Sequence, residues 1–268
     1  GFEFKMFDEC CESLGLDPKT SNQLEWIVQQ SRHRVLFYDP SQSIKPADIN
    51  PAEYNNVIQG TFIQRNTLLS QMRCLGGSDY IDYIKSIFNL ENIPKKVFGD
   101  YDIKVFDDVD QMVQAIKAKD REIGLCRNLA GYAWKWVTKG QTAQQIVAGN
   151  LFDIVIGSYR YYWNTTDKNW ILSPNAVNEI GCVHTSQGYD LNIVGLIFGN
   201  EIDWDERRNC FIINEKEFYD TKVKMDSPEL QIQQHIINAY KVMMTRGIKG
   251  CYMYACNPGM QKFLKKWF

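Results

Sequence analysis

Two segments in the second half of the chain place polar and cationic side chains beside predicted strands. The first is VHTSQGYDLNIVGLIFG from Val183, and the second is NAYKVMMTRGIKGCYMY from Asn238. In the second segment Arg246 lies between a stretch rich in Ile and Met, predicted to be helical, and a predicted strand at 251–255. Both segments have the form of nucleotide-binding motifs located at the ends of strands. They predict phosphate chemistry in this half of the chain.

Arg246 suits such chemistry because a guanidinium group is planar and permanently charged, and pairs with two phosphate oxygens at once. Phosphoryl transfer spreads negative charge over the γ-phosphate oxygens, so a correctly placed arginine can raise the rate roughly a thousandfold or more. With Thr245 and Gly247 on either side, Arg246 could be held by a rigid scaffold and directed into a cleft. The alternative is a surface arginine that closes a helix and interacts favourably with its dipole.

A further polar edge occurs nearer the N-terminus. Residues 35–38 form a short apolar run that predicts a buried strand, and Asp39 and Gln42 follow it in a turn-forming stretch. Because α/β sheets bind ligands outside the carboxyl ends of their strands, this carboxylate and this amide form a candidate site. Arg73 follows another predicted strand, at 68–72.

The 268 residues contain no phosphate-binding loop of the form G-x-x-x-x-G-K-[ST]. Without this loop, we can assign no residue of the chain to binding the α and β phosphates of a nucleotide. We therefore expect the chain to be part of a longer protein. A Walker B carboxylate is expected upstream of residue 1. Asp8 and Glu9 resemble a metal-binding pair only superficially, because the residues around them predict a helix. No metal site is predicted.

Composition indicates a globular protein and excludes several classes. With 44% hydrophobic and 13% aromatic residues, the chain can form one large or two modest domains. The net charge of −2 argues against a uniformly basic coat, although a local positive groove is allowed. The eight cysteines show no C-x-x-C spacing, which favours reduced thiols over zinc or disulfides. With no membrane-length apolar run and no signal peptide, the protein is predicted to be cytoplasmic.

Short apolar runs alternate with amphipathic segments along most of the chain. Helices are predicted at 7–15, 21–31, 78–88 and 108–119, after Ser227 and Pro228, and at the C-terminus; strands are predicted at 103–106, 123–126, 182–184, 193–198 and 251–255, and a hairpin-like stretch at 201–214. This alternation predicts a mostly parallel sheet with helices on both faces. Residues 127–180 interrupt it with aromatic, Gly-rich sequence, which predicts an insertion or a β-ribbon.

Four segments, in order, resemble the later motifs of superfamily 1 helicases, in the version found in a bacterial P-loop family related to the helicase part of Schlafen proteins. They are RVLFYDPSQSI, LLSQMRCLGG, EIGCVHTSQGYD and AYKVMMTRGIKG. The resemblance implies an α/β fold of the RecA-like P-loop NTPase type. Residues 1–65 would be the end of the first lobe, and residues 66–268 the second lobe with an insertion at about 127–180.

The resemblance also implies roles for individual residues. Gln42, Arg73 and Arg246 would be catalytic, with Arg246 as the arginine finger. The residues implied in binding ATP and Mg²⁺ are Asp39, Gln42, Arg73, Gln187, Gly188, Asp190, Tyr240 and Arg246, and Thr245 belongs to the last of these motifs. Two positions depart from the family pattern, because Asp190 stands where Glu is usual and Tyr38 where Gly is common.

Nucleic-acid contacts are predicted in two places. The resemblance assigns His184 and Thr185 to the motif that couples the nucleotide to the nucleic-acid strand. The aromatic insertion interleaves rings with basic side chains, which suits single strands, and its candidates are Trp134, Trp136, Arg160 and Trp163. The alternative is that Tyr159, Tyr161 and Trp163 face the core of a ribbon, and both interpretations stay open.

The resemblance implies that the intact protein is an ATP-dependent helicase or translocase acting on single-stranded DNA or RNA. ATP and Mg²⁺ would bind between the lobes, and the chain without its missing N-terminal lobe and phosphate loop is expected to be inactive. One alternative is a nucleic-acid or protein binding module with a vestigial NTPase site. Another is a nuclease regulated by this lobe, although the sequence offers no nuclease carboxylate cluster.

Overall fold

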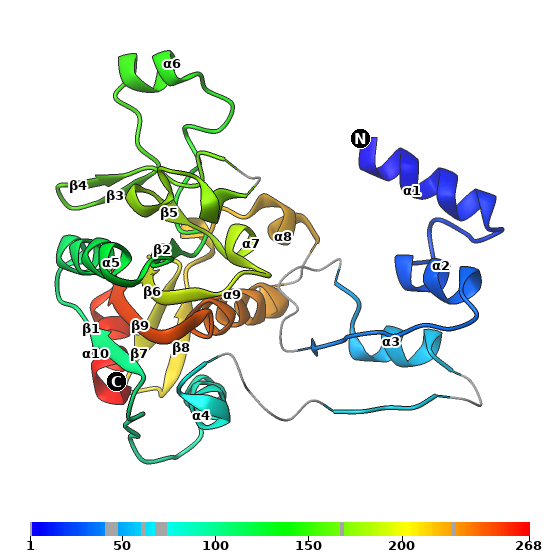
Figure 1. The fold of residues 1–268 in the computed structure, drawn as a ribbon, viewed down its shortest axis with the longest axis horizontal. Coiled ribbons are helices and arrows are strands. Elements are labelled where there is room, and N and C mark those ends of the chain that lie inside the picture. The colour runs from blue at the N-terminus through cyan, green and yellow to red at the C-terminus, as the bar shows by residue number, and fades with distance from the viewer. Residues whose placement is uncertain (1, 41–47, 60–62, 68–73, 167–168, 227–228) are drawn as a thin grey trace. The chain divides into compact units, whose positions relative to one another are not determined.

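The computed structural model describes residues 2–40, 48–59, 63–67, 74–166, 169–226 and 229–268. It divides into two compact units, Gly1–Leu68 and Leu69–Phe268 (Figure 1). The identity of these units as helicase lobes stays a prediction. None of the helices in the described ranges is both long and apolar enough to cross a membrane.

The first unit is helical where it is described. It contains α1 (Phe2–Ser13), α2 (Gln23–Gln30) and α3 (Pro51–Val57). α2 and α3 each begin with a capping box, in which the side chain of Asn22 or Asn50 accepts backbone N–H bonds and a glutamate three residues later bonds back. Residues 2–40, 48–59 and 63–67 include no strand.

The strand predicted at 35–38 is wrong. These residues have no regular secondary structure, and Val35 and Phe37 are 80% and 85% exposed. An apolar run forms a strand only where a neighbouring strand completes its backbone hydrogen bonds. Here Tyr38 instead stacks on Tyr54 of α3, with ring centroids 4.1 Å apart, and donates a hydrogen bond to the Ile49 carbonyl at 2.9 Å. The strand predicted at 68–72 lies outside the described residues.

The second unit is built on a five-stranded sheet. Its strand order is β1 (Asp102–Val105), β9 (Gly247–Ala255), β6 (Leu191–Phe198), β2 (Arg127–Ala130) and β5 (Ile180–Gly181). Every neighbouring pair is parallel. The long central strands β6 and β9 are almost entirely buried, as expected of parallel strands covered on both faces. The α/β class and the parallel sheet are confirmed, whereas the RecA-like P-loop fold stays a prediction.

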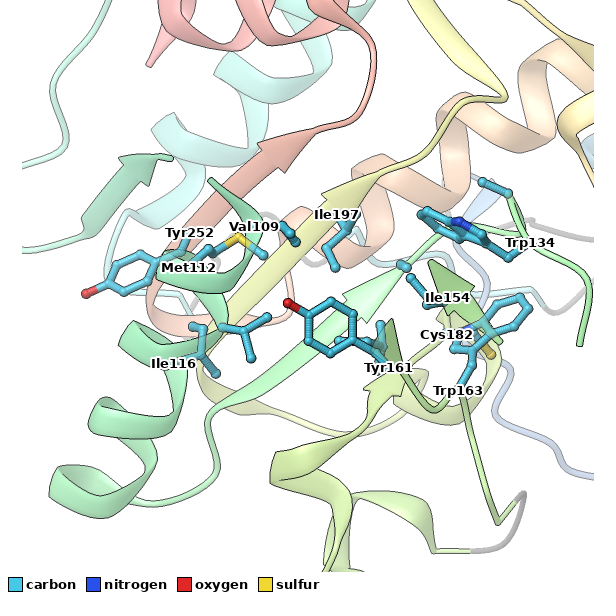
Figure 2. Packing of buried hydrophobic residues seen from close by; sticks show 14 of the residues in the cluster. Val109, Met112, Ile116, Trp134, Ile154, Tyr161, Trp163, Cys182, Ile197 and Tyr252 are labelled. Carbon is cyan, nitrogen blue, oxygen red and sulfur yellow. The ribbon is translucent and has the colours of Figure 1, made fainter. Parts of the chain in front are cut away.

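Helices cover the two faces of this sheet. On one face α5 (Val109–Ile123) contributes Met112 and Ile116 to a core that also contains Ile197 of β6 and the ring of Trp163 (Figure 2). α9 (Glu229–Met244) covers the other face, where Tyr240 stacks on Phe198 with ring centroids 4.3 Å apart. A second core includes α4 (Gly77–Phe88) and α10 (Pro258–Trp267), which meet through Phe88 and Phe263.

Most predicted elements of this unit are present. The helices predicted at 78–88, 108–119 and the C-terminus are confirmed, as are the strands at 103–106, 193–198 and 251–255 and the hairpin, which consists of β7 (Ile202–Asp205) and β8 (Cys210–Ile213). The helix start predicted at Ser227 and Pro228 lies outside the described residues, between α8 (Thr221–Asp226) and α9.

Two predicted strands are wrong. The one predicted at 123–126 lies four residues too early, because α5 continues to Ile123 and Gly124 ends it with a φ of 70°, so that β2 begins at Arg127. The one predicted at 182–184 falls in α7 (Val183–Ser186) instead. There the Thr185 hydroxyl accepts a hydrogen bond from the backbone N–H of Cys182 at 3.0 Å, which closes the chain into a helical turn.

Residues 131–179 leave the sheet after β2 and return to it at β5. They contain α6 (Ala143–Ala148) and an antiparallel ribbon of β3 (Ile154–Ile156) and β4 (Tyr159–Tyr161). The predicted ribbon is therefore present, but residues 127–130 and 180, assigned to the insertion, are strands of the main sheet. The buried side chain of Asp153 stabilises this insertion, residues 131–179, because it accepts hydrogen bonds from the backbone N–H groups of Thr138 at 2.8 Å and Trp163 at 3.0 Å.

Candidate functional site

Arg246 lies at the amino edge of the sheet, directly before β9. Its carbonyl accepts a hydrogen bond at 3.1 Å from the N–H of Leu191, the first residue of the neighbouring strand β6. Gln187, Gly188 and Asp190 are exposed in the loop that enters β6. Gly188 has a φ of 87°, a left-handed conformation that glycine adopts without strain. The structure therefore brings Arg246 and this loop to the same edge of two adjacent strands.

The Arg246 side chain itself is 4% exposed. Contact with a phosphate therefore requires the groups that cover it to move. Thr245, from the same motif, donates its hydroxyl proton to the Val242 carbonyl at 3.0 Å. Tyr240 is directed to the opposite edge, because its hydroxyl accepts a hydrogen bond from Gly199 N at 3.0 Å, just beyond the carboxyl end of β6. The structure does not bring Tyr240 together with Arg246.

His184 and Thr185 lie at the carboxyl edge, in the short helix that follows β5. His184 Nε2 lies 3.5 Å from Asp220 Oδ2, and its ring centroid lies 5.5 Å from that of Tyr132, which follows β2. Thr185 donates its hydroxyl proton to the side-chain oxygen of Asn164 at 2.8 Å. The hydroxyl of Thr185 is thus engaged within the protein, whereas the imidazole of His184 remains 25% exposed.

The resemblance singles out three further residues, Gln42, Arg73 and Asp39. Gln42 and Arg73 lie outside the described residues. Two positions after Arg73, the N–H of Leu75 donates to the Ile248 carbonyl at 2.8 Å, so the chain there runs beside the start of β9. Asp39 belongs to the first unit, where it is exposed.

Some aromatic residues of the insertion, residues 131–179, are buried in the core, and others lie nearer the surface. Trp163 is 0% exposed and Trp134 is 9% exposed, and both belong to the buried cluster that also contains Met112 and Ile116 of α5 (Figure 2). Rings in these positions have no free face for a base, so packing is the role that the structure gives them. Trp136 is half-buried, and the Lys139 ammonium lies 4.9 Å from its ring centroid. Arg160 is exposed on β4.

Comparison with known proteins identifies the family. Residues 11–257 match the family described as Schlafen group 3, DNA/RNA helicase domain. The chain belongs to this family. It is also 28% identical over 272 residues to the uncharacterized protein YPL245W of Saccharomyces cerevisiae (strain ATCC 204508 / S288c). That similarity covers 91% of this chain but 59% of the yeast protein, so the chain spans less than two thirds of this relative. No solved structure matches the chain.

Membership of the Schlafen group confirms that part of the predicted resemblance and indicates a helicase-like function related to nucleic acids. At the amino edge of this Schlafen-group domain Arg246 is a buried cation, and loop 187–190 is largely exposed. Among the described residues, no group of three His, Cys, Asp or Glu side chains is placed to hold a metal ion.

Glu201, three residues beyond β6, is a feature of this Schlafen-group domain that the sequence analysis missed. Burial raises the pKa of its carboxyl to about 7, although a hydrogen bond at 2.5 Å from the Tyr240 hydroxyl lowers it. Its second oxygen, Oε2, has no hydrogen-bond partner among the described residues. A Cβ on Gly131 would lie 2.3 Å from Oε1, and a Cβ on Gly199 would lie 2.5 Å from Oε2. The sequence signal that could have identified Glu201 is an acidic residue soon after an apolar strand.

Proposed function

We propose that the protein is part of an ATP-dependent helicase or translocase that acts on single-stranded nucleic acid. The observation that supports this most is that the Arg246 carbonyl accepts a hydrogen bond from Leu191, the residue directly after loop 187–190, in a chain that belongs to a helicase domain family. In this proposal the Arg246 guanidinium becomes exposed when the lobes close and meets a triphosphate presented by a second lobe. The assignment to superfamily 1, with RecA-like lobes, is part of the same proposal.

In this proposal Gln42, Arg73 and Arg246 act on the γ-phosphate, and another segment holds the rest of the nucleotide with Mg²⁺. The coupling to nucleic acid follows from chain connectivity. α7, which carries His184, continues directly into loop 187–190. If loop 187–190 moved when a nucleotide bound at the amino edge, it would therefore shift His184 at the carboxyl edge. The single-stranded nucleic acid is proposed to lie at that carboxyl edge.

The test is ATP hydrolysis by the intact protein, with and without single-stranded DNA or RNA. We expect strand-stimulated turnover, and a fall of roughly a thousandfold in Arg246→Ala with little recovery in Arg246→Lys, because lysine lacks the planar fork. Arg207→Ala, in the exposed turn of the β7–β8 hairpin, is the matched control and should retain full turnover. Thermal unfolding of each variant separates a lost catalytic group from a lost fold. Normal turnover in a folded Arg246→Ala protein contradicts the proposal.

One observation favours the second candidate, a binding module with a vestigial NTPase site. The Arg246 side chain is 4% exposed, which suits a structural arginine better than a group waiting for a phosphate. A binding module predicts that the intact protein binds single strands but shows no ATP turnover, with or without them. The same hydrolysis assay therefore decides between the two candidates.

A further inference from the structure

Two lysines converge on one tyrosine ring at the carboxyl edge of the sheet. Lys135 Nζ lies 5.8 Å from the ring centroid of Tyr219, and Lys224 Nζ lies 5.9 Å from it. Lys135 is in the segment that follows β2, and Lys224 is in α8, nearly 90 residues further along the chain. The tertiary fold alone thus brings the two ammonium groups to one ring.

Among the described residues, neither lysine of this cluster forms an ion pair with a carboxylate, although Asp220 is the residue next to Tyr219. The Lys224 ammonium donates one hydrogen bond to the Glu215 carbonyl at 2.5 Å. Its other two N–H donors are left for a further acceptor. Lys135 is exposed. Two ammonium groups close to one partly exposed ring favour an anion at this surface.

The cluster adjoins the nucleic-acid motif at the same edge. The N–H of Tyr219 donates to the Tyr132 carbonyl at 2.7 Å, and the Tyr132 ring lies beside His184. His184 in turn pairs with Asp220, the residue after Tyr219, so α7 and the start of α8 are neighbours (Figure 1). Trp136, the residue after Lys135, is half-buried and has Lys139 4.9 Å from its ring centroid.

We infer that this surface, formed by Lys135, Trp136, Lys139, Tyr219 and Lys224, binds the backbone and bases of a single-stranded nucleic acid. The inference rests on the proposed function and deepens it by naming the residues that hold the strand. Each ring is only partly covered and has at least one ammonium group close to it, so a base stacks on the ring while its phosphate meets the lysine. A duplex hides its base faces, and an acidic peptide lacks them.

The experiment measures the binding of fluorescently labelled single-stranded DNA and RNA to the chain by anisotropy, without ATP. Tyr219→Ala should weaken binding about tenfold, whereas Tyr219→Phe keeps the ring and should bind as the unmodified chain does. Lys135→Gln and Lys224→Gln should each reduce the slope of log K against log salt by about 0.7. Lys262→Gln, an exposed lysine on α10, removes the same charge elsewhere and should leave both affinity and slope unchanged.

Three outcomes overturn the inference. The first is equal binding by the unmodified chain, Tyr219→Ala and both lysine variants. The second is equal affinity for single strands and for a duplex, or equal displacement by polyglutamate, which would make the surface a general polyanion or acidic-peptide site. The third is no binding at low salt. None of these three outcomes decides the proposed function, because ATP hydrolysis by the intact protein is measured independently. If the intact protein bound single strands but did not hydrolyse ATP, only the proposed ATPase activity would be contradicted.

Discussion

Glu201 is a side chain whose charge depends strongly on the fold. Burial, the largest cause, raises its pKa from 4.5 to about 7, the Tyr240 hydrogen bond opposes that rise, and the charge of Glu217 adds to it. At low pH the carboxyl is protonated in both the folded and the unfolded chain. As the pH rises above about 4.5 the unfolded chain loses this proton first, so stability falls until the pH has passed the folded pKa.

Glu201→Gln should remove this pH dependence, because an amide fills the same space and never ionises. We expect the unmodified chain to lose about 2–3 kcal/mol relative to the variant between about pH 5 and about pH 8. Urea unfolding at both pH values measures the difference in the free energy of unfolding. Glu206→Gln, in the exposed hairpin turn, should follow the unmodified chain. Parallel pH curves for the unmodified chain and Glu201→Gln would show that the carboxyl is ionised in the fold.

At the scale of elements, Asp108 both starts α5 and ties it to the ribbon. Its Oδ1 accepts the N–H of Gln111 at 2.9 Å as the N-cap, and its Oδ2 accepts the Tyr159 hydroxyl proton at 3.0 Å. Asp108→Ala should destabilise the chain by about 1 kcal/mol or more, while Asp108→Asn should cost much less because Asn caps equally well. Urea unfolding compares the two, and Tyr159→Phe isolates the second bond. An equal loss in the Ala and Asn variants would contradict the capping role.

For the whole molecule, a phosphate-binding loop matters more to ATP hydrolysis than the proposed motifs do. Backbone N–H groups and a lysine normally cradle the β and γ phosphates, and the 268 residues contain no such loop. We therefore expect the chain alone to release no phosphate from ATP at an ordinary rate of about 1 s⁻¹ or more, with or without single strands. A colorimetric phosphate assay, with the intact protein in parallel, tests this. Turnover by the chain alone would mean that it contains a nucleotide grip of another kind.

The predictions succeeded where a few neighbouring residues decide the structure. The N-cap at Asp108 and the apolar runs of β6 and β9 are local signals, and those elements are confirmed. The prediction failed at 35–38, where an equally apolar run has no strand to pair with. It also failed at 183–186, where the side chain of Thr185 closes a helical turn. Composition left the placement of Trp163 open, and the fold buries it.

The sequence by itself determined the Schlafen-group family and the α/β class, because both depend on residue types and on spacing along the chain. Only the tertiary structure decided that Arg246 lies at one edge of the sheet while the Tyr240 hydroxyl lies at the other, that Glu201 is buried, and that Lys135 and Lys224 approach one ring. Each of those facts depends on contacts between residues that lie far apart in sequence, such as Tyr240 with Gly199. Strand order and burial set such distances, and no local pattern encodes them.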